Sequence, residues 1–198
     1  MNKRFENITM TERHPLKPFL PKGAKILMLG SFPPPMKRWK MPFYYPNFQN
    51  DMWRIMGIVF FNDPLHFINA EKKCFKQGEI IDFLTVKGIA IYDSAVEIER
   101  GNNDASDANL QVIERINLSE ILAQIPDCKS IFSTGGKSAE IVADILGVKT
   151  PAVGEFVETV FSNRTIRLYR MPSTSRAFPL KIEVKAQAYE VVREMLLY

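Results

Sequence analysis

The residues best suited to chemistry fall in two short segments that lie far apart in the chain. The first begins with LGSFPPP at 29–35 and continues through aromatic residues into QNDMW at 49–53. The second is MPSTSR at 171–176. Each segment follows an apolar run typical of a strand, and an α/β sheet binds ligands at the carboxyl ends of its strands. We therefore expect the two segments to line one cleft.

The residue types in this cleft suit a flat ring joined to a phosphate. Gly30 and Ser31 form a turn, and Phe32 and Tyr45 offer faces on which a base can stack. Asn50 adds one amide, which can donate and accept hydrogen bonds. Phosphate is bound by backbone amides and hydroxyls, and we assign that role to the second segment: Pro172, Ser173, Thr174, Ser175 and Arg176.

The charge of the chain is a weak indication of a polyanionic partner, and its distribution is a stronger one. The net charge is +4 and the isoelectric point is about 9.0. Lys37 and Arg38 fall inside the first segment beside Trp39, and cations interleaved with aromatics are typical of nucleic-acid binding. Lys137 follows two glycines at an expected helix start, a place that favours phosphate. A solvated lysine is the alternative for Lys137.

Length and composition indicate a single soluble domain. The chain has 198 residues, of which 46% are hydrophobic and 24% are charged. We expect the domain at 25–198, preceded by an irregular, proline-rich arm at 1–24. The sequence lacks a run of about 18 apolar residues that could cross a membrane, and no apolar stretch typical of a signal peptide follows its first residues. We therefore expect a cytoplasmic monomer.

The cysteines and histidines do not suggest a metal centre. Cys74 and Cys128 are too few for a disulfide framework or an iron–sulfur cluster, so we expect two reduced thiols. His14 and His66 are the only histidines and lie outside both segments. Because no His, Cys and carboxylate set has metal-ligand spacing, we expect neither a metal nor another cofactor.

The remaining pattern alternates apolar strands with amphipathic helices, which is typical of a parallel sheet covered on both faces. It predicts a three-layer α/β/α fold around a mostly parallel sheet of four strands. A polar stretch at 97–109, with a turn at 101–104, interrupts the pattern. The expected strands are 25–29, 88–93, 130–134 and 165–171, with a weaker one at 156–161, and the expected helices are 50–61, 70–84, 117–124, 138–146 and 181–197.

Taken in order, these motifs resemble the uracil-DNA glycosylase superfamily. The likeness is greatest to its hypoxanthine-DNA glycosylase branch, and next to the mismatch-specific uracil/thymine glycosylases, and it runs from about Pro15 to the C-terminus. The resemblance implies an enzyme that flips a deaminated base out of DNA and hydrolyses its glycosidic bond with water. The matching stretches are LGSFP at 29–33, YY at 44–45 with QNDMW at 49–53, YDS at 92–94 with Arg100, Gly101 and Asp104, TGGK at 134–137 and PSTS at 172–175.

The resemblance also implies roles for single residues. Asn50 matches the asparagine implicated in catalysis in the hypoxanthine branch, where it would position water; a helix N-cap is the alternative. Tyr45 stands where the mismatch-specific relatives stack a Phe on the flipped base, and Phe32 would form another wall. Asp93 and Ser94 would hydrogen-bond the base or the water, although Asp93 could instead cap its own loop.

Several positions depart from the superfamily pattern. Phe32 replaces the Asp or Asn that orients water in most members, a departure that the hypoxanthine branch shares. Met171 replaces a His or Asn that contacts the base. Asp51 replaces an Arg and adds negative charge near a DNA cleft, which is unfavourable for phosphate. Arg176 or Phe178 would fill the gap that the flipped base leaves.

Two other classes of function remain open at this point. The departures at Phe32 and Met171 suit a non-catalytic nucleic-acid-binding module on the same fold. A hydrolase or transferase acting on a small metabolite would need a nucleophile and a base, and the sequence lacks the Gly-x-Ser-x-Gly motif of α/β-hydrolases.

Overall fold

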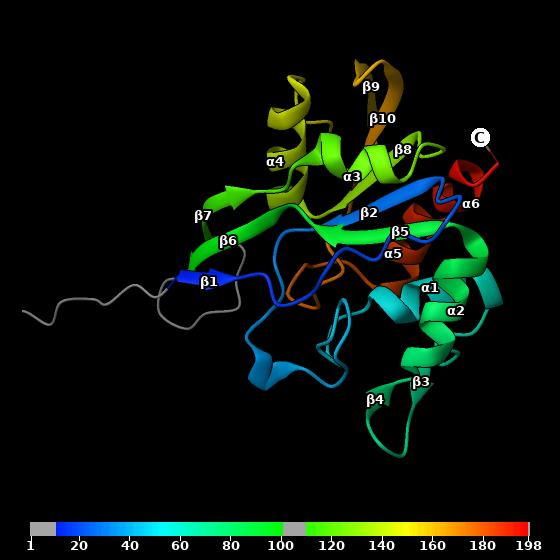
Figure 1. Cartoon of the computed structure of the whole chain (residues 1–198). Coiled ribbons are helices and arrows are strands. Elements are labelled where there is room, and N and C mark those ends of the chain that lie inside the picture. Colours follow the sequence, from blue (N-terminus) through cyan, green and yellow to red (C-terminus); the bar gives the residue numbers. More distant parts are fainter. Residues whose placement is uncertain (1–10, 101–109, 198) are drawn as a thin grey trace, which may run out of the picture.

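Four parallel strands and one antiparallel strand form the central sheet (Figure 1). The computed structural model describes residues 11–100 and 110–197. The strand order is β5-β2-β8-β10-β9. The sheet is larger than expected because β9 pairs antiparallel with the outer edge of β10. The strands are β2 (Ile26–Gly30), β5 (Ile89–Asp93), β8 (Ser130–Thr134), β9 (Phe156–Phe161) and β10 (Arg164–Met171).

Helices cover both faces of this sheet and complete the three-layer α/β fold, which confirms the predicted class. Figure 1 shows α3 and α4 on one face and α1 and α5 on the other. Every residue of β2, β5 and β8 is buried, as expected for continuous apolar strands with helices on both sides. The helices are α1 (Met52–Phe61), α2 (Gln77–Lys87), α3 (Leu118–Gln124), α4 (Gly136–Leu146), α5 (Ile182–Tyr189) and α6 (Val191–Met195), and Met36–Arg38 form a 3-10 turn, η1.

Two helices differ from expectation. Helix α2 begins at Gln77 because a small hairpin, β3 (Ile68–Asn69) and β4 (Cys74–Phe75), occupies the preceding residues. The last helix is divided into α5 and α6 at Glu190. The predicted cap of α3 is confirmed, since the Asn117 side chain accepts a hydrogen bond from the backbone N–H of Glu120.

A second, antiparallel sheet begins where β5 ends. Its strands are β1 (Thr11–Arg13), β6 (Ala95–Arg100) and β7 (Leu110–Arg115), in the order β1-β6-β7. The stretch from 97 to 100, expected to be a polar loop, is therefore strand; the turn predicted at 101–104 lies outside the described residues. Phe32 packs with Ala95, Ile98 and Leu110 in a small core beneath this sheet.

The N-terminal segment from 11 to 24 is tied to the domain along β5. Strand β1 pairs with β6, and Phe19 and Ile91 exchange backbone hydrogen bonds. The hydroxyl of Tyr44 donates to the carbonyl of Lys17 at 2.8 Å. Within the described ranges, no helix is long and apolar enough to cross a bilayer.

Candidate active site

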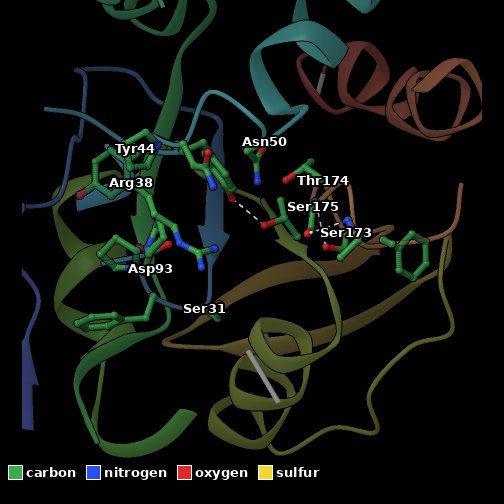
Figure 2. A pocket seen from close by; sticks show the side chains of 18 of the residues that line it. Ser31, Arg38, Tyr44, Asn50, Asp93, Ser173, Thr174 and Ser175 are labelled. Atoms are coloured by element: carbon green, nitrogen blue, oxygen red, sulfur yellow. Dashed lines mark hydrogen bonds between the residues drawn. The ribbon is translucent and has the colours of Figure 1, made fainter. Parts of the chain in front are cut away.

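A cavity of about 520 Å³ lies at the carboxyl ends of β2, β5 and β8. The structure brings the two sequence segments together there: the loop after β2 forms one wall and the loop after β10 another (Figure 2). Its volume is in the range of small-molecule and cofactor sites. The predicted site residues that line it are Gly30, Ser31, Phe32, Arg38, Tyr45, Asn50, Asp93, Ser173, Thr174 and Ser175.

The other predicted site residues do not line the cavity; they are Lys37, Ser94, Lys137, Pro172 and Arg176. Ser94 is fully buried, and its hydroxyl finds no hydrogen-bond partner among the described residues. Pro172 is buried and its carbonyl accepts a hydrogen bond from the Tyr189 hydroxyl at 2.9 Å. Lys37 is exposed on η1, and Lys137 is partly buried in the first turn of α4.

Asn50 lies in a tight turn just before α1. Its backbone N–H donates to Asn47, and its carbonyl accepts from the guanidinium of Arg54 at 3.1 Å. Its side-chain Oδ1 accepts from the backbone N–H of Met52 at 2.9 Å. Only the amide oxygen can accept that bond, so the NH₂ group is the side presented to the cavity (Figure 2). The N-cap of α1 is Asp51, without a side-chain cap bond, so Asn50 stabilises the turn before the helix instead of capping it, and the same side chain faces the cavity.

Asp51 carries its negative charge into a buried ion-pair cluster rather than toward the cavity. The carboxylate lies 3.2 Å from Nζ of Lys185 and 3.1 Å from Nε of Arg176. The expected repulsion of phosphate by Asp51 is thus offset by two cations. Its backbone N–H donates to the carbonyl of Thr174, which joins the start of α1 to the loop after β10.

The loop after β10 keeps its hydroxyl protons available for a ligand. Ser173 Oγ accepts from the backbone N–H of Ser175, and Ser175 Oγ accepts from that of Ala177, both at 3.2 Å. A hydroxyl that accepts one bond can still donate its own proton. Lys185 Nζ, fully inside the protein, also donates to the carbonyl of Ser175 at 2.8 Å. Ser173 and Ser175, which line the cavity, therefore each retain a hydroxyl proton that a ligand can accept.

Two aromatic residues contribute to the cavity wall. Tyr45 has a φ of 51°, which is uncommon for a bulky residue, and its hydroxyl hydrogen-bonds Thr134 Oγ1 at 2.7 Å. Phe32 is 8% exposed, and the guanidinium of Arg100 lies 5.7 Å from its ring centroid. The backbone of Tyr45 is thus held in a strained conformation that directs its ring to the site.

Asp93 is the one acidic residue among the described residues that line the cavity. Its Oδ2 lies 2.9 Å from Nε2 of His14, which comes from the N-terminal segment. A Cβ on Gly30 would lie 2.3 Å from Asp93 Oδ1 and 3.2 Å from the Tyr45 hydroxyl. A side chain at position 30 would therefore displace the Asp93 carboxylate.

Sequence reasoning missed three residues that organise this site. His14 and Lys185 contact it from 79 and 134 positions away along the chain, and no local pattern marks them. Arg100, which falls in the polar stretch expected at 97–109, is buried; it pairs with Glu12 at 2.8 Å and donates to the Pro33 carbonyl at 2.9 Å. The one indication of its role in the sequence was the matching stretch that joins Arg100 to YDS at 92–94.

Burial shifts the pKa of several groups around the cavity. It raises the pKa of Tyr44 strongly, and the charge of Asp93 adds to the effect, so Tyr44 remains a phenol. It lowers the pKa of Arg54, with a further contribution from the charge of Arg176. Within residues 11–100 and 110–197, no group of three or more His, Cys, Asp or Glu is placed to hold a metal ion.

No family model and no curated protein matches the sequence. The structure is similar to a solution NMR structure from Methanosarcina acetivorans described as a "putative Uracil DNA glycosylase". The TM-score is 0.63 and the sequence identity is 22%, over 96% of this chain and 100% of that chain. The chain therefore has the fold of that protein along nearly its whole length.

Proposed function

We propose that the protein is a monofunctional DNA glycosylase that hydrolyses the glycosidic bond of a deaminated base, hypoxanthine or uracil. The observation that carries this proposal is the cavity at the strand ends, where aromatic rings, one amide, one carboxylate and a hydroxyl-rich loop converge. The fold shared with a "putative Uracil DNA glycosylase" supports the same class.

The cavity walls suit a base that has been flipped out of the duplex. Tyr45 and Phe32 offer ring surfaces on which a base can stack, and such stacking offsets part of the cost of flipping. Asp93 is an acceptor when ionised. Deamination converts an acceptor nitrogen of adenine or cytosine into a ring N–H, so this carboxylate favours hypoxanthine or uracil over the parent base.

Asn50 suits the water that attacks the sugar. Its amide NH₂ faces the cavity and can hold a water oxygen, but an amide is not a base, so catalysis rests on positioning and charge stabilisation. The bond from C1′ to the base nitrogen breaks and its electron pair leaves with the base. Water oxygen bonds to C1′, and the proton it loses balances the charge of the released base.

The rim of the cavity suits the DNA backbone. Lys37 and Arg38 are exposed on η1, which is part of the loop after β2. The hydroxyls of Ser173 and Ser175 provide donors for a phosphate on the opposite wall. Because the lining residues of the described chain include no lysine, water rather than an amine is the nucleophile that this arrangement favours.

A non-catalytic nucleic-acid-binding protein is the second candidate. It is favoured by Phe32, which occupies the cavity wall where most of the superfamily that the sequence resembles places a water-orienting Asp or Asn. A base-release assay separates the two candidates. Duplexes that contain hypoxanthine, uracil or a G·T mismatch are incubated with the wild-type protein and with Asn50→Ala.

Release by the wild-type protein that is lost in Asn50→Ala supports the glycosylase, and the best substrate identifies the base. Equal release by both proteins supports the enzyme but limits Asn50 to a structural role in the turn before α1. DNA binding without release from any duplex contradicts the glycosylase and favours the binding protein.

A further inference from the structure

We propose that His14 is a positioning residue that fixes the cavity-facing carboxylate of Asp93, so that the N-terminal segment forms part of the active site. This inference rests on the proposed glycosylase function and adds to it a residue outside the motifs that suggested that function. Three observations carry it: a buried contact, a defined proton position and a ring packed against the cavity wall.

The contact between His14 and Asp93 is short and shielded from water. Nε2 of His14 lies 2.9 Å from Oδ2 of Asp93, and the two side chains are 1% and 8% exposed. Burying a carboxylate is costly unless a donor compensates it. His14, which directly follows β1, supplies that donor from a position remote in sequence, and this leaves Oδ1 of Asp93 as the oxygen nearest to Gly30.

The surroundings of His14 place a proton on Nε2 in either charge state. Its Nδ1 lies 3.2 Å from the backbone nitrogen and 2.9 Å from the carbonyl oxygen of Leu16. In the neutral ring, Nδ1 accepts from the Leu16 N–H and Nε2–H donates to Asp93. In the protonated ring, Nδ1–H donates to the Leu16 carbonyl and Nε2–H still donates to Asp93. The carboxylate therefore keeps its donor in both forms.

The ring of His14 is fixed by its neighbours. Its centroid lies 4.7 Å from that of Tyr92 and 5.3 Å from that of Phe32, which it meets edge-on. Phe32 lines the cavity. The backbone N–H of His14 donates to Val96 at 2.7 Å and so extends the pairing of β1 with β6. His14 thus braces a wall residue and a polar residue of the site at once.

Loss of this brace is expected to affect the reaction more than DNA binding. Asp93 and Phe32 contact the base in the proposed complex, whereas the phosphate contacts come from Arg38 and the loop after β10. A displacement of about 1 Å in a positioned group can reduce the rate about 100-fold. We therefore expect His14→Phe to lower the single-turnover rate by about this factor and to change the dissociation constant for DNA by less than about twofold.

Two substitutions separate the donor from the packing. His14→Phe keeps a ring but removes the donor, whereas His14→Gln retains an N–H near the position of Nε2 and should restore most of the rate. Arg13→Ala is the matched control: Arg13 is the last residue of β1 and directly precedes His14, its side chain is 65% exposed and it pairs with Glu97 and Glu114. It should leave the rate unchanged. If the role of His14 were purely structural, His14→Gln and His14→Phe would have equally low rates of base release when their thermal stabilities are equal.

The experiment measures single-turnover base release from duplexes that contain hypoxanthine or uracil, together with DNA affinity. Loss in His14→Phe with recovery in His14→Gln supports the inference. A fully active His14→Phe overturns the role of His14 and leaves the glycosylase proposal intact. Absence of release by the wild-type protein overturns both.

A second measurement does not depend on activity. The chain has two histidines, so ¹⁵N spectra of the wild-type protein and of His66→Phe assign the ring nitrogens of His14. We expect a proton on Nε2, and its signal should shift in Asp93→Asn. An unprotonated Nε2 in the folded protein would overturn the inference even if the substituted proteins proved too unstable to assay.

Discussion

Asp51 and Lys185 form a buried ion pair, with 3.2 Å between the carboxylate and the ammonium nitrogen. Their side chains are 9% and 1% exposed. The pair joins the start of α1 to α5, and the same ammonium group donates to the carbonyl of Ser175. One lysine thus connects the loop before α1 to the loop after β10, which form two walls of the cavity. Its contribution to the free energy of unfolding and to the site can be measured.

Asp51→Ala should reduce the free energy of unfolding by about 3–5 kcal/mol, because it leaves Lys185 buried without its charged partner. Urea denaturation provides the measurement. Arg176→Ala is the control: it removes the other cation, whose side chain is 52% exposed, and should cost less than about 1 kcal/mol. Equal losses in the two variants would show that Lys185 is not the dominant partner.

Asn50→Ser should separate the structural role of Asn50 in the turn before α1 from its proposed role in the reaction. A serine hydroxyl can also accept from a backbone N–H two residues later, as the Asn50 side chain does from Met52, so we expect the free energy of unfolding to change by less than about 0.5 kcal/mol. The amide NH₂ is lost, and base release should fall by about 100-fold or more if it positions water. Rapid release by this variant would assign Asn50 to the helix alone.

Gly30→Ala should displace Asp93. The added Cβ would lie 2.3 Å from Oδ1 of that carboxylate, which must shift to make room. We expect release of the deaminated base to fall sharply while DNA binding persists. Gly78→Ala is the matched control in α2, where an added Cβ meets nothing within 4 Å; it should raise stability by up to about 1 kcal/mol without affecting activity.

The two thiols should react differently. Cys128 is fully buried, and burial raises its pKa from 9.0 to about 12. At pH 8 a thiol reagent should therefore modify Cys74, which is partly exposed, and reach Cys128 only after denaturation. Modification of both thiols at equal rates in the native protein would contradict this burial.

The same shift predicts alkaline destabilisation. The unfolded thiol of Cys128 ionises from about pH 9, whereas the folded one stays protonated until about pH 12. The unfolded state therefore releases a proton first, and the free energy of unfolding should decrease between these values. Urea midpoints across this range should fall less steeply in Cys128→Ala. An identical slope would assign the effect to the buried tyrosines.

Much of the fold could be predicted from local pattern. Continuous apolar runs identified β2, β5 and β8 because each is buried on both faces, and Asn117 marked the start of α3 because its cap lies within three residues. The start of α2 was misplaced, since a hairpin with only two residues in each strand carries no periodic signal.

The candidate site could be predicted only in part, for a different reason. The two loops were identifiable because ligands bind where parallel strands end. The partners of Asp93 and Asp51 were not identifiable, because His14 and Lys185 reach them through tertiary packing across 79 and 134 positions. The partner of a buried charge can be identified only from the folded structure when the two residues are distant in sequence.

The long loop after β2 is shaped largely by hydrogen bonds to its main-chain atoms. Among the cavity-facing side chains, Asn47 and Asn50 also bond backbone N–H groups of the loop; at the other lining positions of the loop, substitutions can be tolerated without breaking these bonds. Selection, in nature or in the laboratory, could retune the accepted base one lining residue at a time. The bonds that provide this tolerance are Trp39 to the Pro34 carbonyl, Lys40 to Pro46, Asn50 to Asn47 and Asp51 to Thr174.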